Sequence, residues 1–353
     1  MAANLLTLLL LAITACGNKN GNSIEKMPEQ ENSVMNIDIN KFSWTREPQS
    51  CVIKGDTIEV VTKPKTDLWQ RTYYHFQNDN APVFQMEAAE AQSQSPCPLY
   101  GASVEHGDLY CGHQENCAFA MHSVMKFPQA LYVADYLHKK GLTLSDSVLV
   151  HKDSLDAETW SPMLSIFEGM RYFTFAELIE WSLKQSDNNA CDLLFASCGQ
   201  PDAVEKYIHT LGFKDIHVQL TEKEMKKNPH RAIENSATPK EMARLLEWFY
   251  LHRNDNKNLS FIWDTMADCN TGQQRIAAVL PKDGKLIHKT GSGFPSSDGR
   301  QDRNDVGIVL LPDGSHLSIA IFLQKSKEEK EVAEIAEQCL MRIQADGFLR
   351  NMP

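Results

Sequence analysis

A tight turn between two apolar segments near the carboxyl terminus most strongly limits the fold of this chain. Pro312-Asp313-Gly314-Ser315 supplies residues that favour a turn, and apolar residues dominate positions 305–311 and 316–323 on either side. This pattern predicts two antiparallel strands joined by a hairpin. A third strand is expected at 286–292 and a final helix at 328–343. The residues of that helix expected to face the core are Val332, Ile335, Cys339, Leu340 and Ile343.

Helical patterns occupy the middle of the chain. In the first of them, Val124, Phe127, Leu131 and Ala134 share one face. The expected helices are 84–94, 124–138, 174–183, 189–195, 202–211 and 239–251, and the expected strands on the amino side are 98–104 and 109–111. Strands at both ends around central helices predict an α/β (α+β) fold, in which an antiparallel sheet from both termini packs on a helical subdomain.

The composition supports a folded protein and disfavours one class of partner. Of the 353 residues, 42% are hydrophobic and 23% are charged, which provides enough apolar material for a substantial core. The length suits one large domain with additions, or two ordinary domains. The net charge of −11, without a sustained run of Lys or Arg, lacks the basic face that nucleic-acid binding requires. No nucleic-acid partner is therefore expected.

The amino-terminal residues carry a short apolar run that ends in small residues and a cysteine. Residues 5–13 are almost purely apolar and too few to span a bilayer as a helix. Ile13-Thr14-Ala15-Cys16 resembles a lipobox, in which the cysteine is acylated. The resemblance implies a lipoprotein signal over 1–16, export to the periplasm and a membrane contact through lipid on Cys16 only; a cleaved signal or an anchor helix is the alternative. The polar residues 17–40 are expected to form a tether.

A strand-rich segment follows the tether. Residues 57–61 alternate as a half-buried strand does, and 66–74 are rich in β-forming residues. A partial sandwich cannot bury both faces of its sheets, so we expect 41–86 either to dock on its neighbour or to be the remnant of a fusion. The segment resembles the opening of a concanavalin-like β-sandwich family at Phe42, Trp44, Glu47-Pro48, 66–74, Phe76, Asp79 and Asn80.

Cysteines and histidines indicate neither a metal nor a cofactor. Eight of the nine cysteines remain if the lipobox cysteine carries lipid, and an even number permits disulfides without defining their pairing. Cys97, Cys111 and Cys117 cluster without the spacing of a zinc site, and the twelve histidines show no metal spacing. Cys191 and Cys198 lie in an apolar stretch and are expected to pack in the core.

Ser123-Val124-Met125-Lys126 is the first motif with chemical potential. A serine hydroxyl is a weak nucleophile until a neighbouring group accepts its proton. A three-residue spacing on a helix puts the lysine ammonium on the same face as the serine. The motif alone is weak, because Ser23-Ile24-Glu25-Lys26 in the polar tether has the same form.

Two further segments strengthen the interpretation. Ser186-Asp187-Asn188 combines a hydroxyl, a carboxylate and an amide, although an ordinary polar helix cap has the same composition. Lys289-Thr290-Gly291-Ser292-Gly293 ends an apolar strand, where a lysine and a threonine can hold a carboxylate and glycine permits close approach. A basic edge residue followed by a turn is the alternative.

The three motifs in this order resemble the serine-reactive, penicillin-recognising enzymes. The resemblance covers about residues 95–353 and implies a β-lactamase/transpeptidase-like fold, with a catalytic domain over 87–353. Met225, Asn235 and Thr238-Pro239 resemble a Bacteroides-like subgroup. The segments that indicate class A serine β-lactamases are Phe127-Pro128, Thr159-Trp160-Ser161-Pro162, 186–194 and 271–276.

The resemblance implies a catalytic group of four residues. Ser123 attacks the lactam carbonyl, Lys126 accepts its proton or assists Glu222, and Ser186 returns a proton to the leaving nitrogen. Glu222 activates the water that releases the acyl group. Glu224 is the rival if the register slips. Lys226 departs from the family pattern, and a lysine there puts the deacylation rate in doubt if it pairs with a carboxylate.

The resemblance also implies a set of substrate-binding residues. The backbone N–H groups of Ser123 and Ser292 are expected to form the oxyanion hole. Asn188 would bind the acylamide side chain, Lys289 and Thr290 would bind the carboxylate, and Trp160 would form an aromatic wall. The expected partner is a small-molecule β-lactam, and the protein is expected to be a monomer. The alternatives are a penicillin-binding protein or D,D-peptidase, and a non-hydrolytic β-lactam or cell-wall binding protein.

Overall fold

The computed structural model describes residues 45–46, 51–54, 57–60, 99–106 and 109–345, all within the unit 38–353. Within these residues, no helix is both long and apolar enough to cross a membrane. Several expectations lie outside the described residues: the lipoprotein signal with Cys16, the tether, the strand-rich run 66–74, the helix 84–94 and Cys97.

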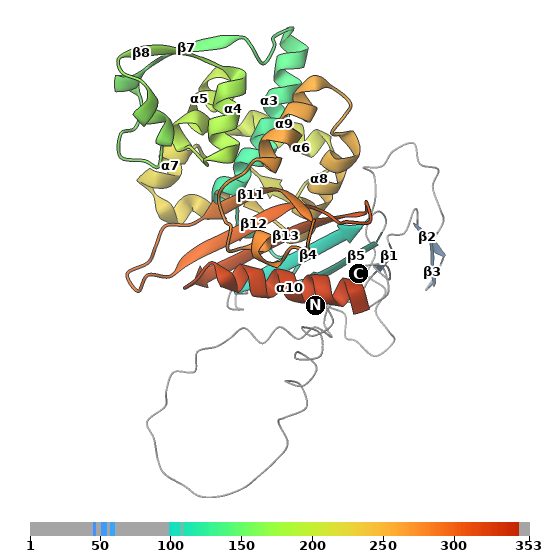
Figure 1. Ribbon diagram of the computed structural model, residues 1–353. Helices are drawn as coiled ribbons and strands as arrows, with labels where there is room; N and C mark the ends of the chain where they lie inside the picture. The colour runs from blue at the N-terminus through green and yellow to red at the C-terminus, as the bar shows by residue number, and fades with distance from the viewer. Residues whose placement is uncertain (1–44, 47–50, 55–56, 61–98, 107–108, 346–353) are drawn as a thin grey trace, which may run out of the picture. The chain divides into compact units, whose positions relative to one another are not determined.

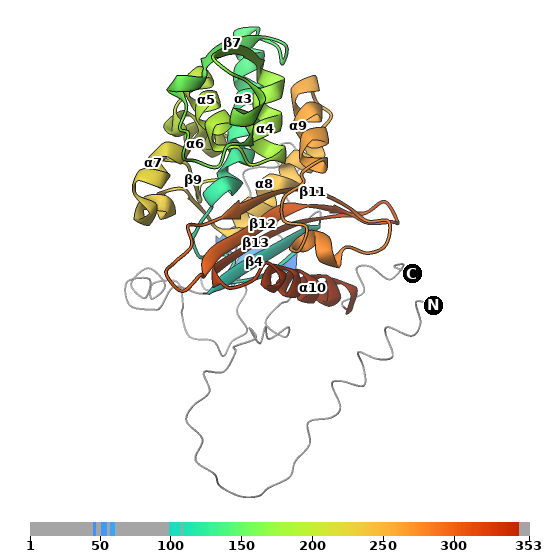
Figure 2. The ribbon, with the colours of Figure 1, turned by 60° about the vertical axis from the view of Figure 1, so that its left-hand side comes forward.

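A six-stranded antiparallel sheet forms the base of the described unit (Figures 1 and 2). Its order is β1-β5-β4-β13-β12-β11, so strands from the two ends of the sequence meet where β4 pairs with β13. The predicted sheet from both termini is therefore confirmed. The strands are β1 (Thr45–Arg46), β4 (Tyr100–His106), β5 (Leu109–His113), β11 (Lys285–Ser292), β12 (Gln301–Leu310) and β13 (His316–Ser326).

The predicted hairpin joins β12 to β13. Asp313 Oδ1 accepts hydrogen bonds from the Ser315 backbone N–H at 2.9 Å and from Ser315 Oγ at 2.6 Å. Gly314 has a φ of +86°, a conformation that glycine adopts without a steric penalty. The turn residues thus act by the local hydrogen bonding that their types favour.

Helices cover both faces of the sheet (Figure 2). On one face α8 (Pro239–His252) packs against β4, β12 and β13, and on the other lies α10 (Lys330–Ala345). The expected inward residues Val332, Ile335 and Cys339 of α10 are fully buried, whereas Leu340 is only partly buried. Ile343 lies outside the residues whose side chains are described.

The helical subdomain sits beyond α8 and encloses most of the core. The predicted face is buried at Phe127, Leu131 and Ala134 of α3 and at Val124, which lies in the short 3₁₀ helix His122–Met125 just before it. Thr174 caps α4 by accepting from the Glu177 backbone N–H at 3.1 Å. The sequence predicted the helices of this subdomain except α7 and α9. The helices are α3 (Lys126–Lys140), α4 (Phe175–Lys184), α5 (Asn188–Cys198), α6 (Pro201–Thr210), α7 (Glu222–Lys227) and α9 (Lys257–Ala267).

Short strands account for the remaining differences from the sequence prediction. The two-residue strands are too short for alternation to reveal them, because two positions contain no repeat. The strands at Ser147–His151 and Met170–Thr174 were not predicted although each has five residues. β2 and β3 pair antiparallel and confirm the strand expected at 57–61, while β1 adds to the edge of the main sheet at β5. These strands are β2 (Cys51–Lys54), β3 (Thr57–Val60), β6 (Phe119–Ala120), β7 (Ser147–His151), β8 (Met170–Thr174), β9 (Ile216–His217) and β10 (Ser236–Ala237).

Four cysteines of the described part of the chain are buried free thiols. Cys191 and Cys198 are buried in the helical core, as the apolar stretch around them predicted. The other two are Cys269 and Cys339.

Candidate active site

The Ser123 hydroxyl projects from the short 3₁₀ helix His122–Met125 that leads into α3. The Met121 N–H donates to the Asn235 carbonyl at 2.8 Å, which ties this turn to the small sheet β6-β10-β9. His122 has a φ of 49°, which is unfavourable for a residue other than glycine. Ser123 follows directly after this residue, and Lys126 is the first residue of α3.

Ser123, Lys126 and Glu222 form a compact triangle. Lys126 Nζ lies 3.0 Å from Ser123 Oγ and 2.9 Å from Glu222 Oε1, and Ser123 Oγ donates to Glu222 Oε1 at 3.3 Å. Lys126 is fully buried and Glu222 is only 7% exposed. Burial strengthens the electrostatic coupling among the three groups, because little water screens them. A hydroxyl held between a cation and a carboxylate suits nucleophilic chemistry.

Asp192 and a capping box position Glu222 at the start of α7. Asp192 Oδ1 accepts from the Glu222 N–H at 2.8 Å, and its other oxygen accepts from the Lys223 N–H at 3.0 Å. Burial, followed by the charge of Glu222, raises the pKa of Asp192 to about 7. Glu224 closes the capping box with Thr221, so its carboxylate is engaged at the helix end. This arrangement favours Glu222 over Glu224 as the reactive carboxylate.

Asn235 holds the segment that precedes Glu222. Its Oδ1 accepts from the backbone N–H groups of Gln219 at 2.7 Å and Leu220 at 2.9 Å. Its Nδ2 donates to the Leu220 carbonyl at 2.8 Å. The amide is fully buried, so these bonds also satisfy polar groups that water does not reach. Asn235 therefore joins the Glu222 segment to the turn that carries Ser123.

Ser186 and Lys289 face the triangle from two other elements. Ser186 follows α4 with a φ of 55°, and its carbonyl accepts from Lys126 Nζ at 2.8 Å. Lys289 lies on β11 and donates to Ser186 Oγ at 3.0 Å and to the Thr290 carbonyl at 2.8 Å. Burial, followed by the positive charge of Lys126, lowers the pKa of Lys289 to about 7. The Ser186 hydroxyl is thus flanked by two lysines, Lys126 and Lys289.

The Ser186-Asp187-Asn188 segment serves two purposes. Asp187 is fully buried and caps α5 by accepting from the Ala190 N–H at 2.9 Å, which agrees with the helix-cap interpretation. Asn188 instead faces the site, where its Oδ1 accepts from Lys126 Nζ at 2.7 Å. The central residue is therefore structural, while its two neighbours contribute polar groups to the site.

A cavity of about 460 Å³ opens over these groups. Ser123, Ser186, Asn188 and Glu222 line it, whereas Lys126 and Lys289 are fully buried. Trp160 is 63% exposed and donates from Nε1 to the Gln185 carbonyl at 2.9 Å, so its ring stands at the mouth. Thr290, Ser292 and Phe294 also line the cavity. Most residues predicted for the site are thus brought to one cavity, with two lysines enclosed in the protein beside it.

The sequence pattern of the "Beta-lactamase enzyme family" matches residues 84–343. The chain belongs to this family. A β-lactamase of Bacteroides uniformis is 35% identical over 237 residues, which cover 65% of this chain and 78% of that protein. "Beta-lactamase VEB-1" of Pseudomonas aeruginosa is 34% identical over 219 residues, which cover 61% and 73% respectively.

Solved β-lactamase structures share the fold. The TLA-3 extended-spectrum β-lactamase has 31% identity and a TM-score of 0.67, and the match covers 73% of this chain and 97% of that one. A class A β-lactamase from Bacteroides cellulosilyticus has 27% identity, a TM-score of 0.67, and coverage of 74% and 97%. The predicted class A family, its Bacteroides relatives and the α/β β-lactamase fold are therefore confirmed. A separate family pattern, "Protein of unknown function (DUF1349)", matches residues 44–97.

Arg275 is a site residue of this β-lactamase that the motifs did not reveal. Its guanidinium donates to Ser292 Oγ at 2.7 Å and to the Gly291 carbonyl at 3.0 Å. It also pairs with Glu329 of α10 at 2.9 Å and is 2% exposed. The sequence offered one signal, a lone arginine within a segment that resembles class A. Arg275 places a fixed positive charge behind Ser292 in the β-lactamase cavity.

Lys226 pairs with carboxylates other than Glu222. Its Nζ donates to both oxygens of Asp156 at 2.9 Å and lies 3.6 Å from Glu158 Oε2. Asp156 in turn holds the pKa of Lys226 above its usual value. The departure from the family pattern thus adds an ion pair beside the cavity, while the cation that contacts Glu222 is Lys126.

Proposed function

We propose that this chain is a serine β-lactamase that hydrolyses penicillins and cephalosporins through an acyl-enzyme on Ser123, and that it thereby confers antibiotic resistance. The observation that carries the proposal is the position of Glu222. Its Oε1 lies 3.3 Å from Ser123 Oγ and 2.9 Å from Lys126 Nζ. A carboxylate beside the nucleophile supports both the formation and the hydrolysis of an ester, and the second step is the one that a resistance enzyme needs.

Acylation begins with Ser123 Oγ attacking the lactam carbonyl. Ser123 Oγ donates to Glu222 Oε1, so this carboxylate is placed to receive the proton directly or through a water, and Lys126 stabilises the developing charge. The backbone N–H groups of Ser123 and Ser292 would hold the oxyanion, and one such donor contributes roughly 3 kcal/mol. When the C–N bond breaks, Ser186 Oγ gives its proton to the leaving nitrogen and takes one from Lys126 Nζ, 3.4 Å away. Lys126 in turn takes the proton that Glu222 received, so the carboxylate is ionised again before deacylation.

Deacylation uses the same carboxylate with a water molecule. Glu222 removes a proton from water as the water oxygen attacks the ester carbonyl, and the proton passes to Ser123 Oγ when the C–O bond breaks. Asp192, Asn235 and the capping box hold Glu222 in place without entering the chemistry. A preformed carboxylate of this kind distinguishes the proposal from a penicillin-binding protein, which acylates and does not release its product quickly.

Substrate binding is proposed for the cavity walls. Lys289, Thr290 and Ser292 would bind the substrate carboxylate, with Arg275 adding charge through its contact with Ser292. Asn188 would bind the acylamide side chain, and Trp160 would stack against the substrate at the mouth. No cofactor enters this mechanism. We propose that the protein acts as a monomer.

Export and domain organisation extend the proposal to the amino-terminal residues. We propose that 1–16 are a lipoprotein signal, that Cys16 is lipidated, and that 17–40 tether a periplasmic catalytic domain of residues 87–353. Residues 41–86 are proposed as a partial, concanavalin-like β-sandwich segment. The support is the lipobox-like sequence at Ile13–Cys16 and the alternation at 57–61. Labelling cells with a fatty acid tests the anchor, because Cys16→Ala should abolish incorporation and leave the protein unanchored.

The decisive experiment is hydrolysis of a chromogenic cephalosporin by the full-length chain. Sustained turnover is expected, Ser123→Ala should abolish it, and Glu222→Gln should reduce it to one burst of product per enzyme molecule. Glu224→Gln is the matched control and should leave turnover intact, because Glu224 serves the capping box. A stoichiometric burst from the unmutated chain would favour a penicillin-binding protein. Folded protein that binds the compound without any burst would favour a binding protein.

A further inference from the structure

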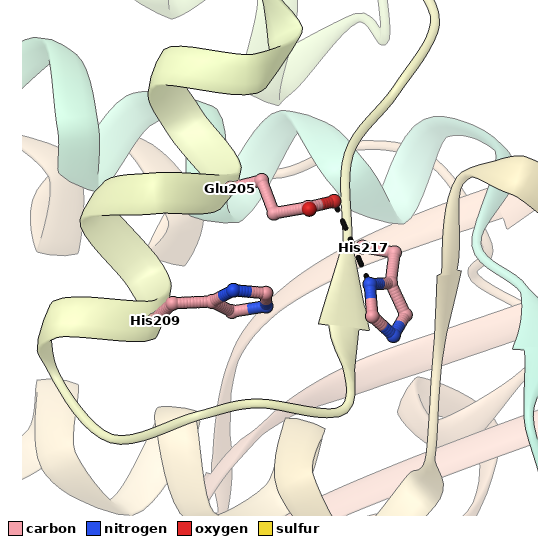
Figure 3. A group of neighbouring side chains, drawn as sticks. All are labelled: Glu205, His209 and His217. Atoms are coloured by element: carbon pink, nitrogen blue, oxygen red, sulfur yellow. Dashed lines mark ion pairs between the residues drawn. The ribbon is translucent and has the colours of Figure 1, made fainter.

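Glu205, His209 and His217 gather at α6 and β9, and none of them lines the active-site cavity. Their candidate ligand atoms, one from each residue, all lie within 4.8 Å of one another. Glu205 and His209 are four residues apart on α6 and therefore share one face of the helix. Figure 3 shows both side chains extending from α6 toward the strand that carries His217.

We propose that these three residues form a zinc-binding site. Two imidazoles and one carboxylate are a ligand set that Zn²⁺ accepts, with water in the fourth position. All three ligands lie within the segment 205–217, so little additional chain must be ordered to bring them together. Histidine spacing alone did not reveal the group, because the third ligand reaches the helix face only when β9 folds back beside α6.

The outer hydrogen bonds of the cluster orient its ligands. Glu205 Oε2 accepts from the Val218 N–H at 2.9 Å and from Gln219 Nε2 at 2.5 Å. His209 Nε2 lies 3.0 Å from the Ile216 carbonyl oxygen. Only a protonated nitrogen can donate to a carbonyl, so in the neutral ring Nδ1 keeps its lone pair for a metal. Ligating histidines commonly use their second nitrogen in this way.

The geometry and exposure of the cluster suit an ion that arrives from solvent. Bonds of about 2.0–2.2 Å in a tetrahedral zinc site place ligand atoms roughly 3.4 Å apart. Glu205 Oε2 and His217 Nδ1 are already 3.6 Å apart (dashed line in Figure 3). The wider separations, up to 4.8 Å, would close by rotation about side-chain torsions. The His217 side chain is 45% exposed and that of Glu205 is 18% exposed, which leaves both room and access.

Zinc at this position would brace the start of the segment that carries Glu222. Along the chain, His217 is followed by Val218 and Gln219, which Glu205 contacts. Gln219 and Leu220 are in turn held by Asn235, so the cluster is continuous with the segment that leads to Glu222. A ligand that binds only the folded state stabilises it by RT ln(1 + L/Kd), where L is the free ligand concentration, so the unfolding temperature rises with ligand concentration. We therefore expect zinc to stabilise the protein and to slow amide exchange at 216–221, without taking part in hydrolysis.

The test uses the full-length chain without a polyhistidine tag, stripped of metal by a chelator. It is titrated with Co²⁺ as a spectroscopic probe and then with Zn²⁺. We expect one Co²⁺ per chain, with the strong visible absorption of a tetrahedral site, and displacement of Co²⁺ by Zn²⁺. His217→Asn and His209→Asn should each weaken binding at least tenfold. His230→Asn is the matched control, because His230 is exposed and lies outside the cluster.

Folding controls keep the result interpretable. His209→Asn removes the bond to Ile216, so circular dichroism of each metal-free variant must match that of the parent chain. Glu205→Gln keeps the size of the side chain and provides a further variant if His209→Asn does not fold. Equal Co²⁺ binding by parent and variants, or only the weak absorption of an octahedral ion, would overturn the proposal. The readout does not depend on hydrolysis, so failure here leaves the β-lactamase proposal untouched.

Discussion

Lys289 Nζ donates to Ser186 Oγ at 3.0 Å, although 103 residues separate the two in the sequence. The contact joins β11 to the segment between α4 and α5 beside the cavity. Burial, followed by the charge of Lys126, lowers the pKa of Lys289 to about 7. Lys289 therefore changes charge within the neutral pH range, and this affects how well it can hold an anionic substrate.

Substrate affinity is expected to fall as the pH rises through about 7. Below that value Lys289 is an ammonium group and attracts the substrate carboxylate, whereas above it the neutral amine does not. KM for a penicillin should therefore rise between about pH 6 and pH 9. Lys289→Arg should flatten the rise, because arginine stays charged. Lys285→Arg, at the exposed start of β11, should reproduce the parent profile. A parent KM that is constant over this range would contradict the prediction.

Arg275→Ala is expected to weaken both stability and substrate binding. The substitution removes the donor from the Gly291 and Asn304 carbonyls and leaves Glu329 without its closest cation. Urea denaturation should show a loss of about 3 kcal/mol in the free energy of unfolding, the lower end for a broken buried ion pair, because Glu329 is partly exposed. KM should rise roughly tenfold, since Ser292 loses a charged hydrogen-bond partner.

Arg303→Ala is the matched control for Arg275. Arg303 lies 3.5 Å from the same Glu329 carboxylate. Its backbone faces Ser292 across β11 and β12, whereas its side chain donates to the Lys327 carbonyl at 3.3 Å, so the substitution leaves the pairing of the two strands in place. Its loss should change KM by less than about twofold and stability by about 1 kcal/mol or less. Equal effects of the two substitutions would mean that net charge, and not the position of Arg275, determines binding.

Lys226→Ala is expected to leave deacylation nearly unchanged. Lys226 contacts Asp156 and Glu158, while Glu222 contacts Lys126. The pair with Asp156 is partly exposed and screened by solvent, so its removal should have little effect on stability. Pre-steady-state hydrolysis of a cephalosporin should show steady turnover from the first cycle, without an initial burst and a slower phase after it. Accumulation of acyl-enzyme in this variant would show that Lys226 assists the water, contrary to the pairing observed.

Gly291→Ala is expected to reduce kcat/KM by about a hundredfold or more, because small displacements of a nucleophile are that costly. A β-carbon at this position would lie 2.4 Å from the Met121 carbonyl oxygen and would push on the turn that carries Ser123. Gly141→Ala is the control: Gly141 has a φ of 66° but no neighbour within 4 Å. That variant should lose about 1 kcal/mol of stability and keep its activity. Similar activity losses in both would indicate general destabilisation.

Elements with a local signal were predictable from the sequence. The β12–β13 hairpin follows from turn residues between apolar runs, and the bounds of α4, α6 and α8 lie within one or two residues of the predicted ones. The proximity of Ser123 and Lys126 follows from their spacing at the start of a helix. Helix and strand periods act over a few residues, so neighbouring positions determine them. Six-residue α7 contains too few positions to reveal a period.

The sequence by itself therefore determined the fold class, the order of the three motifs and the spacing of Ser123 and Lys126. Only the tertiary structure decided which groups meet: Glu222 at Ser123, Arg275 at Ser292, and Lys226 at Asp156. Each of these contacts joins segments that pack together after distant elements have folded. Hydrogen bonds and ion pairs act over a few ångströms, so their partners depend on that packing and not on distance along the chain.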